Sequence, residues 1–304
     1  MKIKCAAIFG LVFCSVIHAQ ISTDGLVAYF PFNGNANDAS GNGNNGKVYG
    51  ATLTNDRYGV ANSAYFFDGA SSCILVSNSP SLSLTNITIS LWVKPAPGFT
   101  VPCYFLQKHE AYDNDDGSWW LGIHDAHLAF QATPYFDEIT ASLSLPSTNQ
   151  WTQCVFTYDN SSGNWAFYLN GRLDSSGNRT FNLQLTTWPL LIGAELQPDG
   201  VSLNYFYYGA MNDIRIYNHA LSSTDVQRLY QIEGAPKIKI INLPNYVTVS
   251  FANLAVGADY QLQVSTDLNS WTNFGAAFTA TNSFMIYTNN WNVSDWDQLF
   301  FRLH

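Results

Sequence analysis

The stretch Ile87–Lys94 reads ITISLWVK, and its residues alternate between two kinds of side chain. One set is aliphatic and consists of Ile87, Ile89, Leu91 and Val93. The set between them consists of Thr88, Ser90, Trp92 and Lys94. Because successive side chains of a strand point to opposite faces, the pattern predicts a half-buried β-strand with its aliphatic face toward a core.

Similar short runs of β-branched and aromatic residues recur on both sides of this strand, separated by Gly, Asn, Asp, Ser or Pro. They include residues 26–32, 152–158, 165–171 and 210–217. Many such runs in a chain of 304 residues predict an all-β fold, namely a two-sheet antiparallel sandwich or jelly roll.

One short helix is expected after these strands. Ser222 and Asp225 have the spacing of a capping box, in which both side chains satisfy free backbone N–H groups. An i, i+3, i+4 apolar stripe follows at Val226, Leu229 and Tyr230, and Gly234 is expected to end the helix.

The two ends of the chain differ from this region. Residues 1–19 combine a short basic start, an apolar run and a final Ala19, which is typical of a secretory signal peptide cleaved after Ala19. Residues 20–234 would then form the jelly roll. Strand-like runs resume after an Ala-Pro pair, so residues 235–304 are expected to form a small second β-sandwich module.

Cleavage would leave three cysteines in the exported protein, Cys73, Cys103 and Cys154. An odd number allows at most one disulfide, and the sequence leaves open which pair would form it. Their wide spacing excludes a compact zinc cluster, which requires closely spaced cysteine pairs.

Composition narrows the class of partner. Only 12% of residues are charged, against about 25% in a typical soluble domain, while 47% are hydrophobic and the net charge is −9. Hydrophobic content this high argues against disorder. Nucleic-acid binding and attraction to an anionic membrane rest on clustered Lys and Arg, so both are excluded as partners.

The opening and closing blocks resemble a known family. Residues 26–46, LVAYFPFNGNANDASGNGNNG, are similar to the opening signature of laminin-G-like jelly-roll domains of the concanavalin A-like lectin/glucanase superfamily. Residues 209–221, GAMNDIRIYNHAL, resemble its closing strand. Intermediate blocks match at residues 65–69, 87–93 and 151–171. The resemblance implies a two-sheet antiparallel jelly roll, and the tail resembles the short immunoglobulin- or fibronectin-like modules of exported bacterial proteins.

The resemblance does not settle function, because the superfamily holds lectins, adhesion modules, hydrolases and lyases. A retaining hydrolase needs two carboxyl groups about 5–5.5 Å apart. No such pair is spaced along one strand, and Asp137 and Glu138 are adjacent, so they would point to opposite faces. No catalytic residues are assigned, although a lyase using a His and a Tyr brought together by the fold remains open.

Calcium is a possible cofactor. Members of the family commonly hold a structural calcium between the opening loop and the closing strand, which implies Asp38, Asn42 and Asp213 as its ligands here. Calcium takes six to eight oxygen ligands, and the Asx-rich opening loop offers many. The alternative is that these Asx residues only build turns, and that Asp213 pairs with Arg215.

Carbohydrate is the expected partner. Aromatic rings that stack on sugars are sought among Trp119, Trp120, Tyr205 and Tyr207, although core packing is the commoner fate of each ring. The sequence therefore favours a secreted, extracellular, non-catalytic protein that binds a polysaccharide or glycoconjugate. The alternatives are an adhesion or scaffold protein that engages proteins or matrix, and a polysaccharide hydrolase or lyase.

Overall fold

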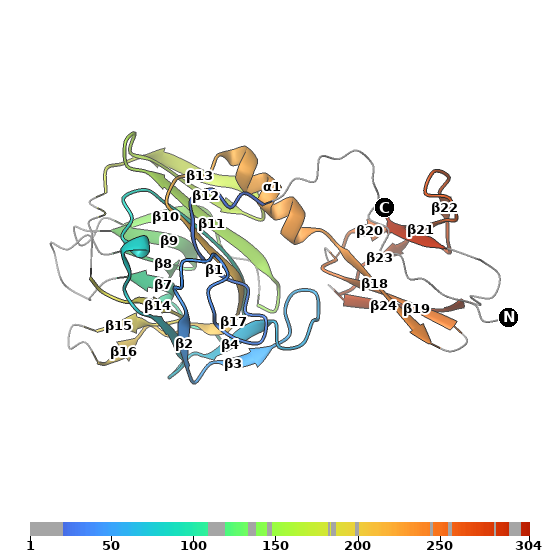
Figure 1. The fold of residues 1–304 in the computed structure, drawn as a ribbon, viewed down its shortest axis with the longest axis horizontal. Helices are drawn as coiled ribbons and strands as arrows, with labels where there is room; N and C mark the ends of the chain where they lie inside the picture. Colours follow the sequence, from blue (N-terminus) through green and yellow to red (C-terminus); the bar gives the residue numbers. More distant parts are fainter. Residues whose placement is uncertain are drawn as a thin grey trace. The chain divides into compact units, whose positions relative to one another are not determined.

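The structure is a computed structural model that divides into two compact units (Figure 1). It describes residues 21–108, 119–132, 138–144, 148–181, 183, 187–197, 201–243, 246–254, 257–282, 284–291 and 299–304. The jelly-roll unit holds Ile21–Asp56 and Val60–Gln231, and the C-terminal unit holds Arg57–Gly59 and Ile232–His304. The predicted signal peptide lies outside the described residues and stays a prediction.

The jelly-roll unit is built from two large antiparallel sheets, as the sequence predicts. The first is eight-stranded, in the order β13-β12-β11-β6-β17-β4-β3, with β1 also paired to β17. Its strands are β1 (Leu26–Phe30), β3 (Thr52–Thr54), β4 (Ala64–Asp68), β6 (Ile87–Pro95), β11 (Thr152–Asp159), β12 (Asn164–Leu169), β13 (Arg172–Asn178) and β17 (Tyr208–Tyr217).

The second sheet is seven-stranded, in the order β10-β9-β8-β7-β14-β5-β2. Its strands are β2 (Gly46–Tyr49), β5 (Cys73–Val76), β7 (Cys103–Lys108), β8 (Trp119–His124), β9 (His127–Ala132), β10 (Glu138–Ser144) and β14 (Leu190–Ile192). A 3-10 turn, η1 (Pro80–Leu82), follows β5, and a small hairpin of β15 (Glu195–Leu196) and β16 (Leu203–Asn204) follows β14.

The core between the sheets is strongly aromatic. Phe130 of the second sheet stacks on Phe156 of the first, with ring centroids 3.9 Å apart and planes 17° apart. Phe167 and Phe181 extend this contact, and all four rings are buried. Each aromatic pair contributes about 0.5–1.5 kcal/mol beyond the area that it buries. The two sheets thus pack face to face through large side chains from β9, β11 and β12 and from the segment that follows β13.

Strand β6 differs from the sequence prediction in one respect. Its aliphatic set lies in the core as expected, but Thr88, Ser90 and Trp92 on the other face are also buried. Helix α1 (Ser223–Gly234) covers part of that face, and Tyr230 stacks on Trp92 with ring centroids 5.8 Å apart. The prediction of a half-buried strand is therefore wrong, because the sequence pattern of one strand does not show which element covers its second face.

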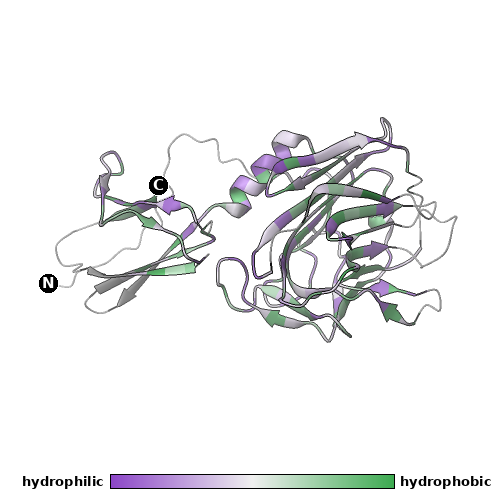
Figure 2. Cartoon of the chain, turned by 180° about the vertical axis from the view of Figure 1, so that it is seen from behind, coloured by the Kyte–Doolittle hydropathy of each residue, from purple (hydrophilic) through white to green (hydrophobic). Residues whose placement is uncertain are grey.

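The predicted helix cap is confirmed for the Ser222 side chain, whereas the Asp225 carboxylate accepts from the Ser222 hydroxyl and not from a backbone N–H group. The Asp225 N–H donates to Ser222 Oγ at 3.2 Å, and the Ser222 hydroxyl donates to Asp225 Oδ2 at 2.6 Å. Figure 2 shows green, hydrophobic stretches in the strands, whereas α1 is mainly purple and white. No helix in the described part of the chain is long and apolar enough to cross a membrane.

The three cysteines of the predicted mature chain are free and buried. Burial raises the pKa of the Cys73 thiol to about 11 and that of Cys103 to about 12, and it also raises the pKa of Cys154. These thiols are protonated at neutral pH and serve as small core residues.

The C-terminal unit consists of small antiparallel sheets. Strands β18 (Lys237–Leu243), β19 (Tyr246–Ala252) and β24 (Phe284–Trp291) form one, and β22 (Thr272–Asn273), β21 (Leu262–Ser265) and β25 (Phe300–Leu303) form another. Strand β20 (Asp259–Tyr260) pairs with β23 (Phe278–Thr279). A core cluster is formed by Val249, Phe251, Leu254, Leu262 and Ala280.

Candidate functional site

Three aromatic rings gather on the outer face of the seven-stranded sheet. We call Tyr104, Trp120, Tyr205 and the underlying Ala129 the outer aromatic cluster. Tyr104 stacks on Trp120 with centroids 4.4 Å apart and planes 12° apart, and Tyr205 lies 5.2 Å from Tyr104. The rings come from β7, from β8 and from the segment before β17, so the fold brings together residues that are far apart in sequence.

A glycine makes this stacking possible. Gly122 on β8 pairs with Tyr104 on β7, and a Cβ atom at Gly122 would lie only 2.9 Å from the Tyr104 Cα and 3.0 Å from its Cδ1. Without a side chain there, Tyr104 lies against β8 and reaches Trp120. Tyr205 is fixed by its backbone, because its carbonyl accepts a hydrogen bond of 3.0 Å from the Tyr104 N–H.

The β15–β16 hairpin brings polar groups to the same sheet. Gln107 Oε1 accepts from the Leu196 N–H at 2.6 Å, which anchors the hairpin on β7. Glu195 is buried and accepts a 2.6 Å bond from Gln197 Nε2, and burial raises the pKa of its carboxyl to about 7. Asn204 pairs with Glu195 across the hairpin and is exposed. The segment leading to Tyr205 therefore carries amide and carboxyl groups.

A second polar group lies on the other side of Trp120. The Trp120 indole N–H donates to Gln131 Oε1 at 3.1 Å. Farther along, His124 Nδ1 lies 3.0 Å from Glu138 Oε1, and their side chains are 40% and 23% exposed. The outer face thus combines one partly exposed ring, Tyr205, with amides and with a partly exposed histidine–carboxylate pair. Such a combination can contact both the C–H faces and the hydroxyl groups of a saccharide.

Only some of the four predicted sugar-contacting rings lie at this surface. Trp119 is 3% exposed and packs on Phe130, and Tyr207 is fully buried. Neither ring lines a surface, so the prediction is wrong for both. Trp119 and Trp120 are neighbours on one strand and therefore point to opposite faces. Trp120 is 4% exposed and stacks on Tyr104, which in turn contacts Tyr205, so Trp120 is part of the support of the exposed ring.

One ring of the cluster and the polar residues beside it were missed by the sequence analysis. Tyr104, Gln131 and Glu195 have no local motif that marks them. Alternation along β7 would group Tyr104 with Leu106, which lies in the core because the register shifts between these two residues, so only the strand pairing places Tyr104 beside Trp120.

The predicted calcium ligands are largely used by the protein itself. The Asp38 carboxylate accepts hydrogen bonds from the N–H groups of Tyr29, Ser40 and Asn44 at 2.8–2.9 Å, and from the Ser40 hydroxyl at 2.9 Å. Asn42 Nδ2 donates to the carbonyl oxygens of residues 26 and 27, each at 3.1 Å. These contacts close the opening loop in the manner of Asx turns.

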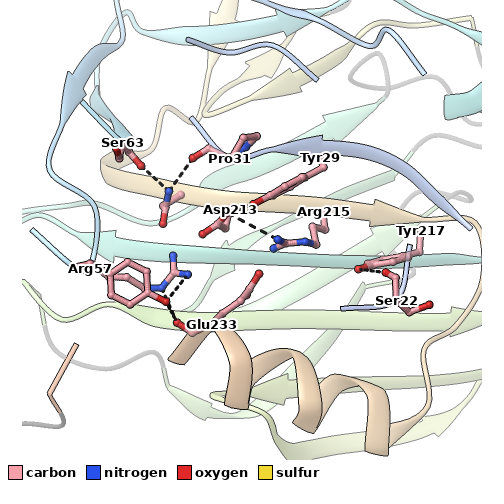
Figure 3. Close-up of polar contacts among 11 residues, drawn as sticks. Ser22, Tyr29, Pro31, Arg57, Ser63, Asp213, Arg215, Tyr217 and Glu233 are labelled. Carbon is pink, nitrogen blue, oxygen red and sulfur yellow. Dashed lines mark hydrogen bonds and ion pairs between the residues drawn. The ribbon is translucent and has the colours of Figure 1, made fainter. Parts of the chain in front are cut away.

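Asp213 meets a different part of β1. Its Oδ1 accepts a 2.6 Å bond from the Tyr29 hydroxyl and lies 4.0 Å from Arg215 Nη2, and the Arg215 guanidinium lies 3.9 Å from the centroid of the Tyr29 ring (Figure 3). Asp38 and Asp213 thus bind opposite ends of Tyr29, the backbone and the hydroxyl. These separate contacts do not bring the two carboxylates together around one calcium ion, and the described residues contain no group of three or more His, Cys, Asp or Glu side chains that could hold a metal ion.

The comparisons with known proteins agree with the architecture. A family model described as the concanavalin A-like lectin/glucanases superfamily matches residues 67–227, more than half of the chain. No curated protein matches it.

Three solved structures with this fold are similar to the chain. Domain 4 of AbnA, a GH43 extracellular arabinanase from Geobacillus stearothermophilus, in complex with arabinotriose, has a TM-score of 0.55 at 22% identity, covering 68% of this chain and 98% of that one. The binding domain of Paraclostridial Mosquitocidal Protein 1 has a TM-score of 0.57 at 18% identity, covering 79% and 58%. Botulinum neurotoxin type C, whose cell entry depends upon interaction with two ganglioside molecules, has a TM-score of 0.51 at 17% identity, covering 79% and 57%. This chain therefore spans less than two thirds of the two toxin structures.

Proposed function

Because this chain belongs to the concanavalin A-like lectin/glucanases superfamily, we propose that it is an exported, non-catalytic protein that binds carbohydrate on the outer face of its seven-stranded sheet. The ligand would be an extracellular polysaccharide or glycoconjugate. The arabinanase domain that holds arabinotriose motivates this choice of ligand class, since it shares the fold. The site itself must be argued from this chain's own residues.

The outer aromatic cluster is the observation that carries the proposal. Tyr205 is partly exposed and rests on Tyr104, which in turn rests on Trp120, so its ring is held in place before a ligand arrives. A fixed ring loses little conformational freedom on binding. The exposed Asn204 amide beside it can donate to and accept from sugar hydroxyl groups.

The test is a glycan array followed by calorimetric titration of the best ligand. Tyr205→Ala should weaken binding about tenfold or more, because it removes the exposed ring face, whereas Tyr205→Phe should retain most of the affinity. Tyr49→Ala is the matched control, since Tyr49 is a 42% exposed ring on the edge strand β2 of the same sheet, three strands away from β7. No binding on the array, or equal binding by Tyr205→Ala and the wild type, would contradict the proposal.

A second candidate function is cleavage of a glycan, which one observation favours. Glu195 is buried with a pKa of about 7, and a carboxyl group that keeps its proton near neutral pH can act as a general acid. The test is the release of reducing ends from a polysaccharide panel. Release by the wild type that is lost in Glu195→Gln would favour cleavage over simple binding. If the chain is instead an adhesion or scaffold protein, it should bind matrix proteins and no glycan.

A further inference from the structure

The C-terminal unit carries a second set of surface groups, on the outer face of the sheet β22-β21-β25 (β21 and β22 in Figure 1). Asn273, Gln263 and Arg302 are direct partners across its three strands. Leu262 lies in the core and Val264 packs against it, so strand alternation places Gln263 on the opposite, outer face. We call Trp271, Asn273, Gln263 and Arg302 the Arg302 platform.

The Arg302 side chain is held on two sides. Its Nε donates to Gln263 Oε1 at 2.7 Å, and its guanidinium carbon lies 4.4 Å from the centroid of the Trp271 ring. Gln263 is itself fixed, since its Nε2 donates to Asn273 Oδ1 at 2.7 Å. The Trp271 indole N–H donates to the Leu268 carbonyl at 3.1 Å, which fixes the ring beneath the arginine.

No counter-ion accompanies this arginine in the described part of the chain. Its bond to Gln263 uses only Nε, so both Nη groups remain available, and no carboxylate among the described residues lies within ion-pair distance. Arg302 is also the only Lys or Arg in residues 240–304. An arginine is usually ordered by an acid, whereas here an amide and an indole order it while the charge stays unpaired and partly exposed.

We propose that the Arg302 platform is a binding site for a saccharide that carries a carboxylate, that is, a uronic acid residue of an acidic polysaccharide. The two Nη groups form a planar fork that matches a carboxylate with two parallel hydrogen bonds. The exposed part of Trp271 contacts the apolar face of the sugar ring, and the Asn273 amide, exposed at the edge of the sheet, bonds its hydroxyl groups. This site is separate from the outer aromatic cluster and does not depend on it.

The experiment is calorimetric titration of the full chain with trigalacturonate at low salt. Binding should weaken as salt is added, and uncharged galactotriose should bind at least about tenfold more weakly. Arg302→Lys keeps the charge but removes the fork and should cost about tenfold in affinity, and Trp271→Ala should cost about as much. Arg172→Ala is the matched control, because Arg172 is an exposed strand arginine of the jelly-roll unit and its loss should change nothing.

The outcomes separate this inference from the proposed function. Tyr205→Ala should bind trigalacturonate like the wild type. Loss of uronate binding in Tyr205→Ala but not in Arg302→Lys would overturn the Arg302 site and leave the outer aromatic cluster as the only saccharide site. Equal affinity for galactotriose and trigalacturonate, or preference for a sulfated galactotriose over trigalacturonate, would also overturn it.

Thermal melting of each variant shows whether that variant is folded. If Arg302→Lys fails to fold, Gln263→Ala, which releases Nε, should weaken uronate binding about threefold, and unchanged affinity in that variant would overturn the inference.

Discussion

The opening loop and the outer aromatic cluster both contain residues that the sequence analysis names as candidate ligand-binding residues. They differ in where the polar groups of these residues lie, because those of the loop bond to the protein itself and those of the cluster lie at the surface. The Asp38 carboxylate accepts four hydrogen bonds, all from its own loop and from β1. At the cluster, Tyr205 and Asn204 keep ring and amide surface at the exterior. A side chain whose hydrogen bonds all go to its own protein stabilises the fold, whereas a ligand site needs fixed groups with exposed surface.

The largest expected effect breaks the opening loop. Asp38→Ala removes the acceptor of three backbone N–H groups, and hydrogen bonds to a charged group contribute about 1.5–3 kcal/mol each, not additively. We expect the free energy of unfolding in urea to fall by about 4 kcal/mol, while the folded fraction keeps its saccharide affinity. Asp24→Ala is the control, because Asp24 is exposed, and it should change stability by less than about 0.5 kcal/mol. Loss of saccharide affinity without loss of stability would reverse the assignment of the two regions.

The next prediction concerns the hairpin beside the cluster. Burial raises the pKa of Glu195 from 4.5 to about 7, so the folded state favours the protonated form. The resulting stability is fully present below pH 4.5 and is lost as the pH rises through about 7. The loss is at most about 3 kcal/mol, at 1.36 kcal/mol per pKa unit.

Glu195→Gln isolates this effect. Urea unfolding from pH 4 to 8 should show the wild type losing stability relative to Glu195→Gln as the pH rises. All other ionisable groups are present in both proteins, so their contributions cancel in the difference. If the free energies of unfolding of the two proteins changed with pH in parallel, Glu195 would not be a buried neutral acid. The hairpin would then not hold its carboxyl group in place for a ligand.

The contrast between the two regions also shows what the sequence could and could not predict. Alternation in β6 and the Ser222–Asp225 cap are local patterns, and local patterns predicted the sheets and the helix. The second face of β6 was missed, because Tyr230 of α1 reaches Trp92 only after the chain has folded back over more than a hundred residues.

The candidate site was less accessible to prediction for the same reason. Alternation alone requires that only one of Trp119 and Trp120 faces outward. Alternation does not show which of the two faces outward, nor that Tyr104 and Tyr205 lie beside it. Both depend on the strand pairing and on the absence of a side chain at Gly122. The role of Asp38 could not be predicted from the sequence either. A loop rich in Asx and Gly can form tight turns or bind a metal, and only the directions of the backbone N–H groups distinguish the two.

The smallest expected effect concerns Asp213, the β17 residue that contacts the Tyr29 hydroxyl. Asp213→Asn weakens one hydrogen bond from the Tyr29 hydroxyl and the 4.0 Å contact with Arg215, so the free energy of unfolding should fall by about 1 kcal/mol. Because Asp38 and Asp213 hold opposite ends of Tyr29, we expect millimolar calcium to leave the melting temperature of EDTA-treated protein unchanged. Asp213→Asn should therefore be destabilised equally with and without calcium. A calcium-dependent rise in melting temperature that Asp213→Asn abolishes would support the predicted metal site. The opening loop would then be a ligand-binding surface, and its role would not be limited to stabilising the fold.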